Sequence, residues 1–378
     1  MKVLHLNAGN ETGGGMVHIL SLLKNNKNMI LGLFEEGPML QQAVSKGIEV
    51  QLFHQKSKFD FTIIKKVCDF IDKNGIDIFH THGPRANLYG YFIKRKRPDC
   101  KWVTTVHSNP YHDFLKKGIS GSVLTKLHLW ALKKPDHYFA ISTRFQELLS
   151  REGIMKDQIT TIFNGIDFST ECSFQITRAD LALNKDDFVV MMIARLTPVK
   201  GHTVALQALE KIVAEHRQVK LLLVGDGFLE EEMKQLTKNL RLEKHVSFLG
   251  FRNDVPSLLK IVDLNLLTSY SESFPLVLLE AAREKKAVIT TDVGGVRDLI
   301  PSEDYGWIVP VKDIESLVEA LEEAIKLKEK GELAQKGIRL YNRASKKFTL
   351  ESFQKSVFDT YKALLKEPFK DSLKESSS

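Results

Sequence analysis

The segment ESFPLVLLE holds two carboxylates, Glu272 and Glu280, with seven residues between them and a proline that suits the start of a helix. Unpaired N–H groups and the helix dipole make such a start a good phosphate site. Glu280 would lie roughly 7.5 Å beyond Pro275 along the axis, at about 1.5 Å per residue. One elongated ligand could place a sugar at Glu272, a diphosphate at the helix start and a ribose at Glu280, which predicts a nucleotide-sugar.

The sequence around Glu272 predicts the elements that would position it. KIVDLNLLTSY, before Glu272, reads as a buried strand, and KAVITTDVGGVRDLI supplies another strand followed by Gly294 and Gly295 at a helix start. Open parallel sheets bind ligands at the carboxyl ends of their strands, where both turns would lie. A surface helix with two ordinary acidic residues would show the same spacing, so the interpretation depends on the other motifs.

ARLTPVKG supplies two cations, Arg195 and Lys200, just beyond the end of the predicted strand FVVMMIA. Arginine can bind two phosphate oxygens with its guanidinium fork, and lysine can act as a point charge. The pair could neutralise a diphosphate leaving group without a metal. Two exposed surface cations are the alternative.

A glycine turn, Gly13, Gly14 and Gly15, follows the first predicted strand and opens a helix, which lets backbone approach an anionic group. It does not match the dinucleotide fingerprint G-x-G-x-x-G, and VGDGFLEEE lacks the third glycine and begins its helix with glutamates that would repel a pyrophosphate. No P-loop pattern occurs in the sequence either. These observations argue against a dehydrogenase.

Three histidines stand near predicted strand ends: His80 and His82 in DIFHTHG, and His107 in TTVHSN. Alternation places His80 and His82 on one face of an extended segment. They could donate to a sugar or a phosphate, or be satisfied structural residues. No third ligand has local support, so a metal site is not predicted.

Composition bounds the class of protein. The chain has 378 residues, of which 43% are hydrophobic, enough for two packed cores. The three cysteines, Cys68, Cys100 and Cys172, are widely spaced, as expected of reduced thiols rather than a disulfide frame or a zinc site. The start MKVLHLNAGN lacks the apolar core of a signal peptide, and no run reaches the roughly 18 apolar residues of a membrane span. We therefore expect a cytoplasmic protein.

The positive charge is concentrated in the N-terminal part. Residues 1–168 hold 23 Lys and Arg against 15 Asp and Glu, a net +8, and the rest hold 31 against 32, a net −1. The excess gathers in KRKR at 94–97 and in an expected amphipathic helix from Lys116 to Lys134 that carries Leu127, Trp130 and Leu132. An anionic membrane surface is the favoured partner, with solvated lysines as the alternative. No zinc-finger or RNA-binding pattern supports nucleic acid.

Strand and helix patterns alternate along the chain in two successions, which predicts two parallel sheets covered on both faces. We expect a first domain over residues 1–168, a linker over 169–186, a second domain over 187–348 and a flexible tail over 367–378.

The ordered motifs resemble the retaining glycosyltransferases of family 4, which have the GT-B fold. The resemblance covers nearly the whole chain and rests on the glycine turn, HTHG at 80–83, the His107 motif, NGID at 164–167, ARLTPVKG at 194–201, VGDG at 224–227, and Glu272 with Glu280. It implies an α/β protein of two doubly wound, Rossmann-like domains facing across a cleft. A C-terminal helix over 349–366 would pack back on the first domain.

The resemblance also implies residue roles. Arg195 and Lys200 would bind the donor diphosphate, Glu280 the ribose and Glu272 the hydroxyls of the transferred sugar, while His107 would assist at the sugar; His107, Glu272, Arg195 and Lys200 form the expected catalytic set. The further donor-binding residues would be Gly14, Gly15, Phe251, Arg252, Ser273, Phe274, Pro275 and Leu276, and the acceptor-side residues His82 and Gly13. The family usually has glycine where this chain has Ser273, which bears on how closely backbone meets the sugar.

The implied reaction moves a sugar from a nucleoside-diphosphate sugar, with uridine favoured, to an acceptor hydroxyl with retention of configuration. It needs no cofactor, no metal and no protein nucleophile. The acceptor would be a glycan, a lipid-linked sugar or a small metabolite, in cell-surface glycan or glycolipid synthesis, and the enzyme would be cytoplasmic or peripheral on the inner face of the membrane. A nucleotide-sugar epimerase of the same architecture and a noncatalytic glycan-assembly protein are the alternatives.

Overall fold

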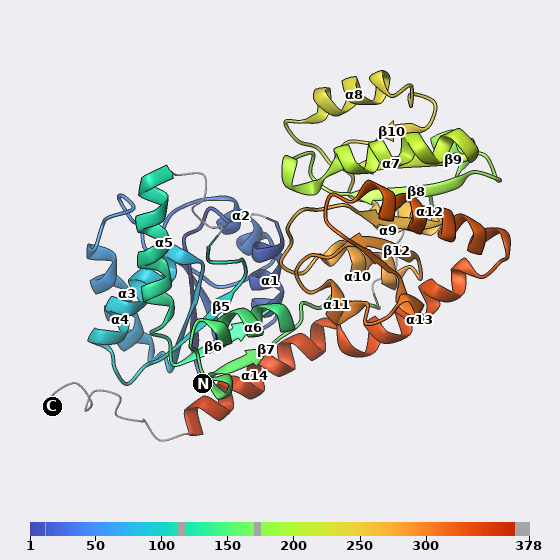
Figure 1. The fold of residues 1–378 in the computed structure, drawn as a ribbon. Helices are drawn as coiled ribbons and strands as arrows, with labels where there is room; N and C mark the ends of the chain where they lie inside the picture. Colours follow the sequence, from blue (N-terminus) through green and yellow to red (C-terminus); the bar gives the residue numbers. More distant parts are fainter. Residues whose placement is uncertain (12, 112–117, 170–174, 367–378) are drawn as a thin grey trace. The chain divides into compact units, whose positions relative to one another are not determined.

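The computed structural model describes residues 1–11, 13–111, 118–169 and 175–366, and the chain forms two compact units. The first unit comprises Met1–Phe163 together with the chain from Leu350, and the second comprises Asn164–Thr349. The colours of Figure 1 follow the chain through the first sheet, then the second, and back to the first unit with the last helix, α14.

The first unit is built on a seven-stranded sheet in the order β3-β2-β1-β4-β5-β6-β7, with every pair parallel. Its elements are β1 (Val3–Asn7), α1 (Gly14–Leu23), β2 (Met29–Leu33), α2 (Pro38–Ser45), β3 (Val50–Leu52), α3 (Thr62–Asn74), β4 (Ile78–His82), α4 (Pro84–Lys96), β5 (Lys101–Val106), α5 (Gly118–Leu132), β6 (His137–Ala140), α6 (Thr143–Arg151), β7 (Ile159–Thr161) and α14 (Leu350–Lys366).

The second unit is built on a six-stranded parallel sheet in the order β10-β9-β8-β11-β12-β13. Its elements are β8 (Phe188–Ile193), α7 (His202–Glu215), β9 (Val219–Val224), α8 (Glu230–Asn239), β10 (Val246–Phe248), α9 (Val255–Ile261), β11 (Leu264–Leu267), α10 (Leu276–Arg283), β12 (Ala287–Thr291), α11 (Val296–Leu299), β13 (Trp307–Val309), α12 (Ile314–Glu329) and α13 (Leu333–Lys347). Short 3₁₀ turns lie at Lys156–Gln158, Ala179–Leu181, Pro198–Lys200 and Glu303–Tyr305.

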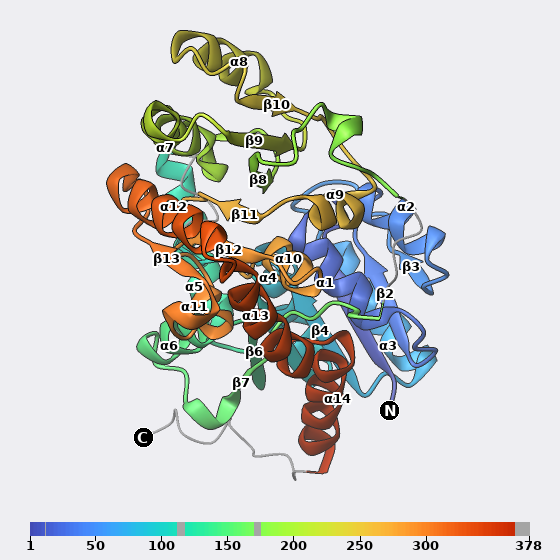
Figure 2. The same ribbon diagram turned by 90° about the vertical axis from the view of Figure 1, so that its right-hand side faces the viewer.

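Helices cover both faces of each sheet, which is why the strands are nearly continuous apolar runs. In the first unit α1, α2 and α14 pack on one face, while α3 and α4 pack on the other. In the second unit α7 and α12 lie side by side over one face, and α10 packs against α13 and β12 (Figure 2). The predicted α/β class with two doubly wound domains is confirmed.

Each sheet has one place where the strand order reverses, between β1 and β4 in the first unit and between β8 and β11 in the second. Loops after the two neighbouring strands leave in opposite directions there, which opens a crevice at the carboxyl edge. The predicted cationic turn follows β8, and the turn with Glu272 follows β11. The second sheet therefore brings these two motifs together at its switch point.

The domain boundaries differ from those expected from the sequence. The second unit begins at Asn164, and the described part of the expected linker, residues 175–186, packs on it. Arg178 pairs with Asp263 (Nη2–Oδ2 2.9 Å) and also donates to the carbonyl oxygen of Asp187 (3.0 Å). Residues 175–186 are thus part of the second unit rather than a linker. The tail over 367–378 lies outside the described residues.

The last helix, α14, packs on the first sheet through a stripe of buried side chains: Phe353, Val357, Tyr361 and Leu364. This spacing of four, four and three residues keeps one face of a helix toward the sheet. Tyr361 reaches the strand histidines, and its hydroxyl lies 2.5 Å from His80 Nδ1.

Two of the three cysteines, Cys68 and Cys100, are buried and form no disulfide, and Cys172 lies outside the described residues. Burial raises the pKa of the Cys100 thiol to about 12, so it stays protonated. In the described part of the chain no helix combines the length and apolar character that a bilayer crossing requires.

Candidate active site

An ion pair joins the two loops at the second switch point. Lys200 Nζ lies 2.5 Å from Glu272 Oε1, and the Ser269 hydroxyl donates to the same oxygen at 2.6 Å. Both charged side chains are partly buried, so the pair is screened less than one on the surface. The structure thus brings together one cation and one carboxylate of the predicted catalytic set, and it adds Ser269, which the sequence reading missed.

Close backbone contact locks the β8 loop against the β11 loop. Gly201, which precedes α7, has φ 69°, and a Cβ at this position would collide with the carbonyl oxygen of Thr268. The Thr268 hydroxyl in turn donates to the carbonyl oxygens of Gly201 (3.0 Å) and Lys200 (3.2 Å). A glycine is required here because only it fits both the dihedral angle and the contact. The Lys200 backbone is therefore fixed relative to β11.

A second lock connects the Glu272 loop to the turn after β12. The Gly295 N–H donates to the Ser273 carbonyl oxygen at 3.0 Å, and the Thr291 hydroxyl donates to the Ser269 carbonyl oxygen at 2.6 Å. A Cβ on Gly294 would collide with the same Ser273 oxygen. Ser273 itself is not among the residues with positive φ, so its conformation does not require the glycine that the family usually has there.

The helix after Glu272 offers an anion site at its start. α10 begins at Leu276, with Pro275 as the preceding cap residue, one position later than the sequence suggested. No side chain caps this end and no acidic residue lies in its first turn, so its N–H groups and dipole have no built-in anion. The Phe274 side chain is buried against Phe348 (ring centroids 5.6 Å), so only its backbone could meet a ligand.

Glu280 lies one turn into α10 and is half-buried. Desolvation raises the pKa of its carboxyl, and nearby Arg283 partly opposes that shift. The Arg283 guanidinium is itself paired with Glu284 (Nε–Oε1 3.1 Å). The carboxylate of Glu280 has no hydrogen-bond partner within residues 1–11, 13–111, 118–169 and 175–366, so it is available to a hydroxyl pair of a ligand.

The remaining predicted donor residues lie on neighbouring strand ends of the second unit. Arg195, two residues beyond the end of β8, is exposed and forms no ion pair with any described residue. Phe251 follows β10 with 69% of its surface exposed, and the loop is held to β9 by the Gly225 N–H, which donates to the Gly250 oxygen (2.8 Å). Arg252 is engaged by Asp254 through Nε (2.8 Å) and Nη2.

In the first unit the glycine turn forms the start of α1, with Gly13 as the cap residue at φ 73°. No side chain caps the helix, and Gly14 is exposed, with open space where a Cβ would be. A Cβ on Gly15 would meet the Glu11 carboxylate, whose Oε2 accepts from Asn7 Nδ2 at 2.5 Å. Burial raises the pKa of Glu11, and the Asn7 hydrogen bond opposes the shift. The sequence reading missed Glu11, although an acidic residue beside a glycine turn is a visible signal.

The predicted histidines also meet in the first unit, together with two residues that the sequence did not single out, His5 and Tyr361. His82 Nδ1 lies 2.9 Å from His107 Nε2, and His82 Nε2 lies 3.0 Å from His5 Nδ1. His80 is fully buried and is engaged by Tyr361 and Thr105, which makes it a structural residue. Neither partner has a local sequence signal, because His5 is on the first strand and Tyr361 on the last helix.

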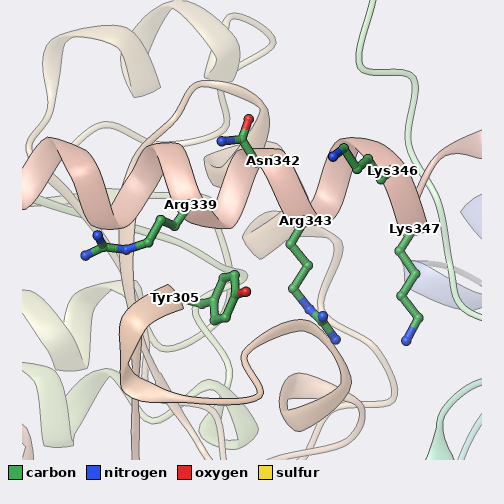
Figure 3. A pocket seen from close by; sticks show the side chains of 6 residues that line it. All are labelled: Tyr305, Arg339, Asn342, Arg343, Lys346 and Lys347. Carbon is green, nitrogen blue, oxygen red and sulfur yellow. The ribbon is translucent and has the colours of Figure 1, made fainter.

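A separate basic hollow of about 390 Å³ lies in the second unit beside α13. It is lined by Tyr305, Arg339, Asn342, Arg343, Lys346 and Lys347, and Figure 3 shows the Tyr305 ring between the two arginines. Arg343 donates to the carbonyl oxygens of Asp298 (2.7 Å) and Leu299 (3.0 Å), which satisfies the end of α11. Arg339 likewise donates to the Asp304 oxygen (3.1 Å). Both arginines therefore have structural hydrogen-bond partners, and none of the residues that line the hollow belongs to the predicted motifs.

Comparison with known proteins gives two family matches that together span most of the chain. The model described as glycosyl transferases group 1 matches residues 173–340, and the model described as Glycosyltransferase Family 4 matches residues 31–170.

Among individual relatives, the chain is 32% identical over 264 residues to N-acetyl-alpha-D-glucosaminyl L-malate synthase of Bacillus anthracis, covering 68% of each chain. It is 28% identical over 261 residues to UDP-Gal:alpha-D-GlcNAc-diphosphoundecaprenol alpha-1,3-galactosyltransferase of Escherichia coli, covering 66% of this chain and 67% of the relative.

Solved structures share the fold. Anabaena Alr3699/HepE, crystallised with UDP, matches with a TM-score of 0.84 at 23% identity, over 96% of this chain and 100% of that one. The lipopolysaccharide outer core galactosyltransferase WaaB matches with a TM-score of 0.76 at 19% identity, over 96% and 100% of the two chains.

Proposed function

The chain belongs to the glycosyl transferases group 1, and on this premise we propose that it moves a sugar from a UDP-sugar to an acceptor hydroxyl with retention of anomeric configuration. The observation that carries the proposal is the Lys200–Glu272 pair beside the uncapped start of α10. It puts a cation, an anion-binding helix end and a hydroxyl acceptor at one switch point, which is the set of groups a nucleotide-sugar needs.

Binding of the donor would exchange partners at this ion pair. The diphosphate would take Lys200 and the α10 N-terminus, with Arg195 as a second cation, and the Glu272 carboxylate would then accept from hydroxyls of the sugar. Positive charge at the leaving diphosphate stabilises the developing negative charge in the transition state. The rigid turns at Gly201 and Gly294 support this function because they hold both groups in register.

The nucleoside would extend along α10 and toward β10. We propose that Glu280 accepts from the ribose hydroxyls and that the exposed Phe251 ring lies against the base. Uridine is favoured because the Escherichia coli relative is named for UDP-galactose. In the first unit, His107, Gly14 and Gly15 complete the proposed donor set, and Gly13 and His82 are assigned to the acceptor side.

We propose a lipid-linked glycan as the acceptor and a peripheral position on the cytoplasmic face of the membrane. The Escherichia coli relative acts on a sugar carried by diphosphoundecaprenol. An exposed apolar stripe on α5 gives a surface that could meet such a lipid. A small anionic metabolite is the second candidate, since the Bacillus anthracis relative is named for L-malate.

The test has two steps. Thermal unfolding with UDP, GDP and ADP should show the largest stabilisation with UDP, because a ligand selective for the folded state raises the melting temperature. Purified protein should then release UDP from a UDP-sugar only when acceptor is present, and NMR of the product should show the anomeric configuration of the donor. Inversion of configuration would contradict the retaining mechanism.

The alternatives give different outcomes in the same assay. An epimerase would convert the UDP-sugar without an acceptor and without UDP release. A noncatalytic assembly protein would bind and release nothing. Either result would overturn the proposed transfer.

A further inference from the structure

Helix α13 of the second unit carries a row of cations and no acidic residue. Its 15 residues include five Lys and Arg and no Asp or Glu. Arg339, Arg343 and Lys347 follow one another at intervals of four residues, so they lie on one face of the helix. Like charges at this spacing destabilise a helix. The row therefore lowers the stability of α13 unless another group compensates its charge.

The basic hollow described above lies against this row. Its volume of about 390 Å³ is within the range of roughly 300 to 1,000 Å³ that is usual for small-molecule sites. Four of its six lining residues are cations, and the other two, Tyr305 and Asn342, are neutral and polar. Residues 169–378 hold 31 Lys and Arg against 32 Asp and Glu, a net −1, so the positive charge is local to the hollow. Such a lining favours an anionic ligand.

Both arginines of the hollow are oriented by partners that carry no charge. Arg343 donates through Nε to the Leu299 oxygen (3.0 Å) and through Nη2 to the Asp298 oxygen (2.7 Å). Arg339 donates through Nε to the Asp304 oxygen (3.1 Å). All three acceptors are backbone carbonyls, which fix a guanidinium in place without cancelling its charge. Nη1 of Arg343 and both Nη atoms of Arg339 have N–H groups that no described residue accepts.

Carboxylates neutralise several other arginines of the same unit. The pairs are Arg178 with Asp263, Arg252 with Asp254, Arg283 with Glu284 and Arg297 with Asp292. Within the described ranges of the chain, neither Arg339 nor Arg343 has a carboxylate partner, although the exposed Glu303 is in the turn next to them. The two guanidinium groups are thus held in a fixed orientation and lack a counter-charge from the protein.

The dipole of α13 is the competing explanation for these cations. Lys346 and Lys347 are in the last turn, where positive charge stabilises a helix. The effect falls off beyond the last turn. Arg343 is four residues before the end of α13 and Arg339 is eight residues before it, so the dipole does not account for them.

We propose that the basic hollow binds the phosphate group of a small phosphorylated ligand. Arg339 and Arg343 hold the phosphate oxygens with their remaining N–H groups, because the guanidinium fork matches the geometry of phosphate. Lys346 adds a point charge. The Tyr305 hydroxyl, which has no hydrogen-bond partner in the part of the chain that the structure describes, donates to a further oxygen. The Tyr305 ring is held beside the fork, with its centroid 5.6 Å from Arg343 Cζ (Figure 3).

The phosphate belongs either to a soluble phosphate ester or to the headgroup of a phospholipid, since both offer the same oxygens. The inference does not depend on the proposed sugar transfer, because none of the residues of the hollow is in the proposed donor set.

The direct test reads the two guanidinium groups by NMR in the full chain labelled with ¹⁵N-arginine. Their Nε–H signals are assigned by their absence in Arg339→Gln and Arg343→Lys. With sn-glycerol 3-phosphate as the soluble probe, the signals of both arginines should shift together and saturate. Sodium chloride at the same ionic strength should not reproduce this shift, because screening of charge does not saturate as a binding site does.

Two double variants test the contribution of the cations. The hollow variant, Arg339→Gln with Lys346→Gln, removes two exposed cations and leaves the Arg343 hydrogen bonds intact. It should raise the dissociation constant for glycerol phosphate, read from the Arg343 signal, by roughly 100-fold, or about tenfold for each lost charge-assisted contact. The control variant, Lys238→Gln with Lys244→Gln, removes two exposed cations elsewhere in the unit and should bind like the parent. Equal weakening in both variants would overturn the proposal, because the probe would then respond only to overall charge.

A third variant separates the hollow from the proposed donor site. Lys200→Ala changes the donor site and should leave the Arg343 shift as it is in the parent. Loss of the shift in this variant would place the phosphate at the donor site and overturn the proposal. If the parent protein transfers no sugar, the proposed function fails, while the arginine signals still decide whether the hollow binds phosphate.

Sedimentation with vesicles distinguishes the two sources of phosphate. Vesicles of phosphatidylcholine with phosphatidic acid offer the same phosphate ester at a membrane surface. Trp130→Ser is used as the background, because Trp130 is an exposed residue of α5 that could bind vesicles by itself. Lower recovery of the hollow variant than of the control variant in this background would assign the site to a phospholipid. Equal recovery of the two, with a saturable shift in glycerol phosphate, would assign it to a soluble ester. Neither a saturable shift nor a difference in recovery would show that the hollow is not a phosphate site.

Discussion

Lys200 and Glu272 neutralise each other across the switch point of the second sheet, with 19% and 14% of their side-chain surfaces exposed and 2.5 Å between Nζ and Oε1. The pair satisfies two partly buried charges that would otherwise cost free energy. It also keeps both groups in place for a ligand that offers each of them a new partner. The same contact therefore serves stability without a ligand and, under the proposed function, catalysis with one.

Replacing Lys200 by alanine should lower kcat/KM by about 10²- to 10³-fold, the typical effect of losing one group aimed at transition-state charge. Because Glu272 loses its counter-charge in this variant, Lys200→Ala and Glu272→Gln combined should cost less than the sum of the two single changes. Steady-state kinetics of the four proteins measures this coupling. Lys211→Ala, which breaks a more exposed pair with Glu315, is the matched control and should be near the parent. Strict additivity would show that the two residues act independently.

Glu280→Gln should weaken UDP binding and stabilise the ligand-free protein. The native carboxyl has a raised pKa, so the folded state holds its proton to higher pH than the unfolded state does. Because of this pKa difference, the Glu280 carboxyl lowers the free energy of unfolding as pH rises above the ordinary carboxyl range. A neutral amide has no such effect. We expect a higher Tm for Glu280→Gln at pH 8, a smaller gain at pH 4.5 and a lower UDP affinity by calorimetry.

Glu319→Gln is the matched control for Glu280→Gln, because Glu319 is an exposed residue of α12 in the same unit. Glu319→Gln should change neither the Tm nor the affinity for UDP. Unchanged UDP affinity in Glu280→Gln would remove the ribose assignment.

The sequence could predict the second switch point because its signals are local. Apolar runs predict the strands β8 and β11. In a parallel sheet the carboxyl ends of the strands lie at one edge, so the sequence predicts that Lys200 and Glu272 lie near each other. The contact of Gly294 with Ser273, by contrast, depends on the order of strands, which a strand pattern does not reveal.

The contact of Tyr361 with the strand histidines could not be predicted, for a related reason. His5 and Tyr361 are 356 residues apart, and their contact requires both the β1–β4 register and the return of α14. The sequence likewise gives no sign of the ion-pair partners of the basic motif at 94–97, because they are distant along the chain. Lys94 pairs with Asp136 (2.7 Å), and Arg97 binds Asp72 with two nitrogens.

Acid should unfold the first unit at a higher pH than the second. Burial lowers the pKa of six described histidines of the first unit, so they stay neutral in the folded state and take up protons on unfolding; they are His5, His80, His82, His107, His128 and His137. Among the described residues of the second unit, His202 has such a shift. Each proton taken up lowers the free energy of unfolding by about 1.4 kcal/mol per pH unit below pH 6.5.

Hydrogen exchange read by mass spectrometry can follow both units in one sample. Peptides of the first sheet should lose protection between pH 6.5 and 4 while those of the second sheet remain protected, and all should be protected at pH 8. Loss of protection in the second sheet first would show that other groups control acid stability.

Sugar transfer should survive removal of divalent metals. Arg195, Lys200 and the start of α10 supply positive charge for a diphosphate, and the Glu272 carboxylate is already engaged by Lys200 and Ser269. We expect an unchanged rate after EDTA treatment and dialysis into metal-free buffer. Loss of activity with recovery on adding Mn²⁺ would contradict this prediction.

The surface of α5 should bind anionic membranes. Val123, Leu127 and Trp130 are 62%, 38% and 41% exposed and follow one another at helical spacing, so they form an apolar stripe on one face. Leu132, which the sequence assigned to the same surface, is in the core instead, and Lys116 and Lys117 lie outside the described residues. Lys134 lies over the Trp130 ring at 5.9 Å, and Arg95 lies over Tyr91, which packs edge-on against Trp130.

Cations beside exposed apolar residues favour the interface of a bilayer rich in anionic lipid. Sedimentation with vesicles of phosphatidylglycerol and phosphatidylcholine should recover the protein at low salt and less of it as salt screens the charges. Trp130→Ser should weaken recovery at every salt concentration, whereas Arg95→Gln with Lys134→Gln should mainly remove the salt-dependent part. Lys94 and Arg97 are left intact because their ion pairs stabilise the fold.

The control, Lys238→Gln with Lys244→Gln, removes the same charge from the second unit and should bind like the parent. Equal recovery with purely phosphatidylcholine vesicles, or parent-like recovery of the Trp130 variant, would exclude this surface and favour a soluble acceptor.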